Sequence, residues 1–226
     1  MKSKEALALL KKYGASEDVV RHVKKVRDYA LEIAEQNPAA DRELVEAGAL
    51  LHDIGRSRTH GIDHAVAGAR ILRAEGVDER IVRIVERHVG AGLTKEEAVY
   101  LGLPPADYVP EAIEEKIVCH ADNLIGNRSR ISIHDAIRTA KERWSPGALE
   151  RLIRMHFEVF RPEKAIVDRS FCAAGALDDL IGQLDVLFKS TRENDHCVVA
   201  VYGHDSERAV ARLRKFSTSA ALSSDR

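Results

Sequence analysis

Apolar residues recur every three or four positions along most of the first 189 residues, which is the spacing of amphipathic α-helices. Gly, Pro and capping residues divide this pattern into segments of helical length. The pattern therefore predicts an all-α fold, a helical bundle. The expected helices cover residues 3–13, 16–36, 41 to a stop at Gly55, 62–75, 78–89, a short segment from 94, 111–125, 132–144, 146–160 and 163–189.

The pattern changes in the last part of the chain. Residues 197–202 predict a strand, residues 206–215 a short helix, and the small polar residues 217–226 a disordered end. A single strand cannot bury itself, so we expect it to pair with another chain, lie on the bundle or be poorly ordered. We divide the chain into a helical domain, residues 1–189, and a C-terminal appendage of uncertain order, residues 190–226.

Composition narrows the class of protein. The 226 residues are 45% hydrophobic and 31% charged, with a formal net charge of −1, so nucleic-acid binding is not indicated. No apolar run is long enough for a membrane span. The three cysteines form no Cys-x-x-Cys motif, which argues against a disulfide framework or a cysteine zinc site. We expect a cytoplasmic protein and leave open whether it forms a homo-oligomer.

The strongest chemical signal is the segment Leu51-His52-Asp53-Ile54-Gly55. Adjacent imidazole and carboxylate groups suit a borderline or hard divalent cation. Further potential ligands lie on the apolar sides of predicted helices. They are His22, His64, His88 and Asp122. An ionisable group that faces a protein core needs a partner, and one metal ion would satisfy several of these groups at once.

These residues suggest two metal positions. The first would be a tight site made by His22, His52, Asp53 and Asp122, with coordination positions left open for water and substrate. The second would use His64 and His88, with Asp53 as a bridging carboxylate. Such ligands suit a divalent Mn, Fe, Ni, Co, Zn or Mg ion, and a metal-activated water would attack phosphorus.

The order of these ligands resembles that of the HD-domain superfamily of metal-dependent phosphohydrolases. Residues 51–55 are similar to the HDIG variant of its motif, and residues 63–72 resemble the segment that carries the next ligand in the HD-GYP phosphodiesterases. The resemblance covers residues 16–130, and residues 100–165 look similar to an archaeal branch of HDIG proteins. It implies an HD-type helical bundle with a metal site between helices.

One departure from the HD-GYP signature concerns the second metal position. Val89 follows His88 where a second His would be expected. A site with fewer protein ligands is expected to bind its ion more weakly. The departure also argues against specificity for cyclic dinucleotides.

We therefore expect metal-dependent hydrolysis of a phosphate ester, by a phosphomonoesterase or a phosphodiesterase. The expected partner is a small phosphorylated substrate, such as a nucleotide or a related small phosphate. Asp53 would bind the first metal and orient or deprotonate the attacking water. Basic residues near the motifs would hold phosphate or, alternatively, are solvated loop charges. They are Arg56, which we also place in catalysis, Arg58, Lys95 and Arg128.

Two other functions use the same ligands. A non-catalytic regulatory module would bind a nucleotide at a retained metal site and release no product. A di-iron oxygenase would use the same scaffold for oxygen chemistry. The intact set of ligands argues against the regulatory module, because degenerate modules usually lose the His-Asp pair.

Overall fold

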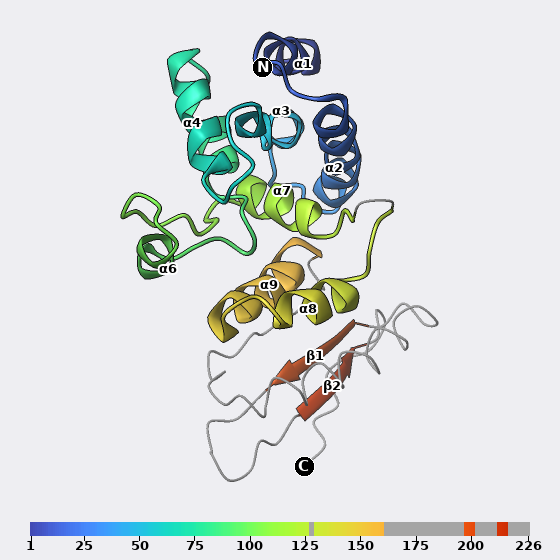
Figure 1. Ribbon diagram of the computed structural model, residues 1–226. Helices are drawn as coiled ribbons and strands as arrows, with labels where there is room; N and C mark the ends of the chain where they lie inside the picture. Colours follow the sequence, from blue (N-terminus) through green and yellow to red (C-terminus); the bar gives the residue numbers. More distant parts are fainter. Residues whose placement is uncertain (127–128, 161–196, 202–211, 217–226) are drawn as a thin grey trace.

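The computed structural model describes residues 1–126, 129–160, 197–201 and 212–216 (Figure 1). Within these residues the chain is helical up to Phe160, which confirms the predicted all-α bundle. The helices are α1 (Ser3–Lys12), α2 (Glu17–Glu35), α3 (Arg42–Leu51), the short 3₁₀ helix η1 (Ile54–Ser57), α4 (His64–Ala74), α5 (Glu79–Glu86), α6 (Lys95–Tyr100), α7 (Ile113–Asn123), α8 (Ile133–Lys141) and α9 (Pro146–Phe160).

Side-chain caps fix several helix starts where the sequence predicts them. The Ser16 hydroxyl accepts a hydrogen bond from the Val19 amide at the start of α2. The Asp41 carboxylate accepts two amide hydrogen bonds at the start of α3. Thr94 and Glu97 form a reciprocal capping box on α6. These caps satisfy amides that have no partner inside the helix, which is why such residues predict helix starts well.

The core lies where α2, α3 and α7 pack together, with α4 and α5 beside them, α9 packed against α7 and α8 packed against α9 (Figure 1). The buried face of α2 carries Val23, Val26 and Ile33, and that of α7 carries Ile117 and Ala121. Each set is spaced by three, four or seven residues, so one side of each helix is apolar and faces the core. The metal-ligand candidates are carried on these core helices and at their ends.

Two of the helix ends that differ from the prediction carry candidate ligands. The fifth helix, predicted to reach residue 89, ends at Glu86, so His88 lies in the turn after α5. The third helix ends at Leu51, and the expected polar loop begins with the 3₁₀ helix η1. In both places the chain leaves the helix early and places a histidine or aspartate in a tight turn.

The C-terminal segment contains a hairpin. Strand β1 (Cys197–Val201) pairs antiparallel with β2 (Arg212–Phe216), with Cys197 opposite Phe216. The predicted strand is therefore confirmed over residues 197–201, and its partner is a strand of the same chain. The helix predicted over 206–215 is wrong for residues 212–215, which belong to strand β2. The basic and apolar residues of Arg-Leu-Arg-Lys-Phe fit an extended strand as well as a helix.

Other predictions for this part of the chain fall outside the described residues. These are the helix over 163–189 and the disordered end over 217–226. The domain boundary after residue 189 stays a prediction. Among the described helices, none combines the length and the apolar character needed to cross a bilayer.

Gly55 allows η1 to lie directly against the first turn of α4. A Cβ atom at Gly55 would lie 1.9 Å from the His64 carbonyl oxygen and 2.6 Å from the Gly68 amide nitrogen. Gly68 is equally confined, since its Cβ would lie 2.9 Å from Val85 Cγ1. The two backbones can touch only because neither residue has a side chain. This contact sets the position of His64 relative to the His52-Asp53 pair.

We predict that Gly55→Ala lowers the free energy of unfolding by about 3 kcal/mol, because the added methyl must push two backbone segments apart. Urea unfolding followed by circular dichroism measures this loss. Gly147→Ala is the matched control, because the atom nearest to its Cβ is 3.7 Å away. The control should gain up to about 1 kcal/mol from better helix propensity. Equal stability of Gly55→Ala and wild type would show that the two backbones do not constrain each other.

Candidate metal centre

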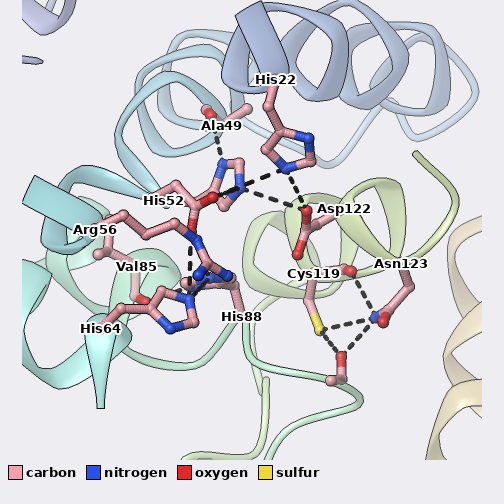
Figure 2. A network of polar contacts seen from close by, with 12 residues as sticks. His22, Ala49, His52, Arg56, His64, Val85, His88, Cys119, Asp122 and Asn123 are labelled. Carbon is pink, nitrogen blue, oxygen red and sulfur yellow. Dashed lines mark hydrogen bonds and ion pairs between the residues drawn. The ribbon is translucent and has the colours of Figure 1, made fainter. Parts of the chain in front are cut away.

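The predicted ligands converge from separate elements of the bundle (Figure 2). Their positions are His22 on α2, His52 at the C-terminal end of α3, Asp53 in the turn before η1, His64 at the start of α4, His88 after α5 and Asp122 in the last turn of α7. His52, Asp53, His64 and His88 are buried, whereas the side chains of His22 and Asp122 are 30% and 23% exposed. The centre therefore has a buried side and a side that opens to solvent.

The two carboxylate oxygens of Asp53 face two different pairs of imidazoles. Its Oδ1 lies 3.3 Å from His64 Nε2 and 3.7 Å from His88 Nε2. Its Oδ2 lies 3.8 Å from His52 Nε2 and 3.9 Å from His22 Nε2. Asp53 thus stands between the two groups of ligands that the sequence suggested.

Asp122 completes the first group of candidate ligands, which also contains His22, His52 and Asp53. Its Oδ1 lies 2.9 Å from His22 Nε2 and 3.4 Å from His52 Nε2. Ligand atoms of three residue sets lie within 4.8 Å of one another. The sets are His22, His52 and Asp53; His52, His88 and Asp122; and Asp53, His64 and His88. His88 therefore contributes to both groups, which its position in the sequence did not indicate.

Three of the histidines are oriented by the same local contact. The Nδ1 atom of each lies at hydrogen-bond distance from the carbonyl oxygen three residues earlier in the chain. The pairs are His52 with Ala49 at 2.8 Å, His64 with Gly61 at 2.7 Å and His88 with Val85 at 2.7 Å. A carbonyl oxygen can only accept, so each Nδ1 carries the proton and donates it. In the neutral ring, Nε2 then presents a lone pair to the centre.

These lone pairs are the feature of the centre that best fits a metal ion. His64 Nε2 and His88 Nε2 lie 3.0 Å apart, so two lone pairs face each other. His52 Nε2 is buried and has no hydrogen-bond partner among the described residues. A buried acceptor without a donor is costly, and a shared cation would satisfy all three nitrogens. Imidazole and carboxylate donors suit the divalent first-row metals.

The electrostatics of the centre favour a bound cation as well. Burial opposes charge on the Asp53 and Asp122 carboxyl groups, but the neighbouring histidines hold the pKa of both well below the usual range. Burial alone would lower the pKa of His52, yet the charges of Asp53 and Asp122 raise it to about 9. Burial lowers the pKa of His88. The two carboxylates therefore retain their charge in the core and require a neighbouring positive charge, either a proton on His52 or a metal ion.

The predicted phosphate-binding residues are placed differently from one another. Arg56 lies at the centre, where its Nε donates a 2.8 Å hydrogen bond to Asp53 Oδ1. Arg58 is exposed, and its guanidinium lies 5.5 Å from the centre of the Tyr13 ring. Lys95 begins α6, which stands apart from α2, α3 and α7 in Figure 1. Arg128 lies outside the described residues. Of the three that the structure describes, Arg56 is the one that lies at the ligands.

A cavity of about 420 Å³ that was not predicted from the sequence lies beside the centre. It is lined by Asp18, Val19, Arg21, His22, Lys25, Asp53 and Gly126. The missed signal is helical spacing, because residues three or four apart share a face of a helix. Lys25 follows His22 by three positions, so the face of α2 that presents the ligand also presents a lysine.

A further group of residues holds the turn after His88. Cys119 Sγ and Asn123 Nδ2 both donate to the Gly90 carbonyl, at 3.1 and 2.5 Å (Figure 2). Arg151 donates to the carbonyl of Gly92 at 3.0 Å. The last turn of α7 therefore carries the ligand Asp122 and also anchors the segment that follows the ligand His88. These positioning residues carry no spacing pattern that the sequence alone could show.

His120 lies away from the centre, as its position on α7 predicts. It is buried against α9, where its Nε2 lies 2.9 Å from His156 Nδ1. Its ring also packs edge-on against Phe160. The His120–His156 pair therefore helps to pack α7 against α9 and contributes nothing to the ligand set.

Similar proteins share this region of the chain. Residues 19–127, which include every ligand above, match the HD domain family. The Methanocaldococcus jannaschii protein named Uncharacterized protein MJ0778 is 50% identical over 165 residues, which cover 70% of this chain and 97% of that protein. A Thermoplasma volcanium protein named tRNA (cytidine(56)-2'-O)-methyltransferase is 53% identical over 150 residues, 66% of this chain. The match covers 44% of the Thermoplasma protein, less than half its length.

Among solved structures, the HD domain of the L. monocytogenes phosphodiesterase PgpH in complex with cyclic-di-AMP gives a TM-score of 0.47 and 18% sequence identity. The aligned part covers 80% of this chain and 97% of that chain. The family match and the nearly full-length match to the Methanocaldococcus protein confirm the resemblance found in the sequence. This chain belongs to the HD domain family.

Proposed function

We propose that this protein is a metal-dependent phosphohydrolase that acts on a nucleotide or a related small phosphate. The observation that carries the proposal is the position of Asp53, whose two oxygens face two separate pairs of imidazole nitrogens. A carboxylate in that position suits a bridge between two divalent ions. Membership of a family whose members are generally hydrolases supports the same reaction class.

When bound, divalent ions would supply an activated water and neutralise charge on the phosphoryl oxygens. His22, His52, Asp53 and Asp122 would hold one ion, and His64, His88 and Asp53 the other. The backbone carbonyls of Ala49, Gly61 and Val85 keep the imidazole Nε2 atoms unprotonated and aimed inward. Asp53 would accept the proton of the attacking water.

Arg56 has two tasks in this proposal. Its Nε donates to Asp53 Oδ1 and so holds the carboxylate in the orientation that divides its oxygens between the two ligand groups. Its side chain is 33% exposed, so the remaining guanidinium nitrogens can reach a phosphate at the open side. The roles proposed for Arg58, Lys95 and Arg128 stay predictions from the sequence.

The surroundings of the centre favour hydrolysis over the two alternatives. Arg21 and Lys25 line the adjoining cavity, which suits an anionic substrate better than the oxygen chemistry of a di-iron oxygenase. All the predicted ligands converge, which argues against a regulatory module that has lost catalysis. Cytoplasmic location and self-association stay predictions.

The name of the Thermoplasma relative, a tRNA methyltransferase, bears on which substrates should be tested. We do not infer methyl transfer, because this chain matches less than half of that protein and its centre consists of metal ligands. An RNA phosphate nevertheless belongs among the substrates to be tested. The panel therefore contains nucleoside monophosphates, phosphodiesters and short RNA, each with Mn²⁺, Ni²⁺, Co²⁺ and Mg²⁺.

We predict that Asp53→Asn lowers kcat/KM on the best substrate of this panel by roughly 100-fold or more, because the amide can neither bridge two ions nor accept a proton. Circular dichroism should show that the variant keeps its helical content. Asp28→Asn is the control, an equal change on the exposed side of α2. Near-wild-type activity of Asp53→Asn would exclude this mechanism.

The second metal position makes its own prediction. Calorimetric titration of metal-free protein with Mn²⁺ should reveal one tight and one weak equivalent. His64→Ala should remove the weak one, because His64 belongs to the second ligand group alone. His60→Ala, an exposed histidine outside the centre, should keep both. A wild-type protein that is fully active with a single bound equivalent at saturating Mn²⁺ would favour a one-metal mechanism instead.

For Arg56 we predict that Arg56→Lys lowers kcat/KM roughly tenfold, since lysine keeps the charge but loses the planar fork. Arg42→Lys, the same exchange at an exposed residue at the start of α3, should stay close to wild type. If steady-state kinetics cannot distinguish Arg56→Lys from wild type, Arg56 neither orients Asp53 nor clamps phosphate.

A further inference from the structure

The cavity beside the metal centre is built largely from one face of α2. Asp18, His22 and Lys25 follow one another at helical spacing and all line it, as does Arg21. Asp53 contributes to the same wall, so the cavity and the ligand cluster are continuous. A substrate whose reacting phosphate lies at the centre would therefore extend along this face of α2.

We propose that this cavity binds a second phosphate group of the substrate through Lys25, with Arg21 as an additional cation. The inference rests on the proposed hydrolase function and narrows its substrate class. The substrate is then a nucleoside that carries two phosphates, and not a simple monophosphate.

Burial distinguishes the two cations. Lys25 is partly buried beside the centre, so its charge is less screened by water than that of a surface lysine. The Arg21 side chain is 63% exposed and forms an ion pair with Asp18 on the same helix. Lys25 is therefore the main contact, and the more exposed Arg21 adds a weaker one.

The dimensions of the cavity fit a second phosphate on the same nucleoside. Side chains three residues apart on a helix are separated by about 5–6 Å at Cβ, so Lys25 stands about one helical turn from His22. Phosphates on the 3′ and 5′ positions of one ribose can reach both points. The cavity volume of about 420 Å³ lies in the range of small-molecule pockets.

Two sources offer this chemistry, a free nucleoside bisphosphate and the end of an RNA strand. In both, one nucleoside is flanked by two phosphates. The test therefore uses three probes with the same base. They are adenosine 5′-monophosphate, adenosine 3′,5′-bisphosphate and the 5′-phosphorylated dinucleotide pApA.

The measured quantity is the ratio of kcat/KM for the bisphosphate to kcat/KM for the monophosphate. Wild type should prefer the bisphosphate, and Lys25→Gln should lower the ratio about tenfold, the effect of losing one hydrogen bond to a charged group. The change should fall mainly on KM. Lys24→Gln is the matched control, because Lys24 is exposed, carries the same charge and does not line the cavity.

An equal ratio in Lys25→Gln, Lys24→Gln and wild type overturns the second phosphate position while leaving the proposed hydrolase intact. If neither wild type nor either variant hydrolyses any probe, the proposed function fails for this substrate class. Calorimetric titration of the Mn²⁺-loaded protein with the bisphosphate then tests the binding of the second phosphate without any need for turnover. Weaker binding confined to Lys25→Gln supports it, and equal binding by all three proteins overturns it.

A preference for pApA over the bisphosphate assigns the position to an RNA end, and the reverse preference to a free nucleotide.

Discussion

Two carboxylates that keep their charge inside the bundle are the constraint on which the rest of the structure depends. In their neutral rings, His52, His64 and His88 present Nε2 lone pairs and donate no hydrogen bond to the two carboxylates. Arg56 donates to Asp53, and His22 Nε2 lies 2.9 Å from Asp122 Oδ1, but the remaining carboxylate–imidazole contacts have no proton to share. A cation at the centre would resolve this conflict. The touching backbones at Gly55, the carbonyls that hold Nδ1 and the anchored turn after His88 keep the candidate ligand atoms aimed at the position that a cation would occupy.

Much of this arrangement can be predicted from the sequence, because it follows from helical periodicity. His22 and Asp122 occur within apolar stripes, and an ionisable residue in such a stripe must face the same core as its neighbours. The caps at Ser16 and Asp41 are equally local, since each involves residues within three positions. The candidate ligands can therefore be identified from the sequence without knowing how the helices pack.

The remaining features depend on contacts between distant segments. The early end of α5 and the 3₁₀ turn after Asp53 occur where segments distant in sequence pack against each other. Local sequence patterns cannot predict such contacts. Proximity in sequence also misleads: Arg58 is close to the motif, yet the contact described for it is with Tyr13, directly after α1. Lys25 lies far from the motif in sequence, yet it lines the cavity with Asp53 because α2 and α3 pack together.

The location of two ligands at helix ends has a thermodynamic consequence. His52 and Asp122 occupy the C-terminal ends of α3 and α7, where the partial negative charge of each helix dipole is concentrated. Two dipoles and two carboxylates together oppose the binding of phosphate at a metal-free centre. Under the proposed function, metal ion and anionic substrate would be linked ligands, so each would raise the affinity of the other by the same factor. The protein would thereby reserve its phosphate affinity for the metal-loaded state.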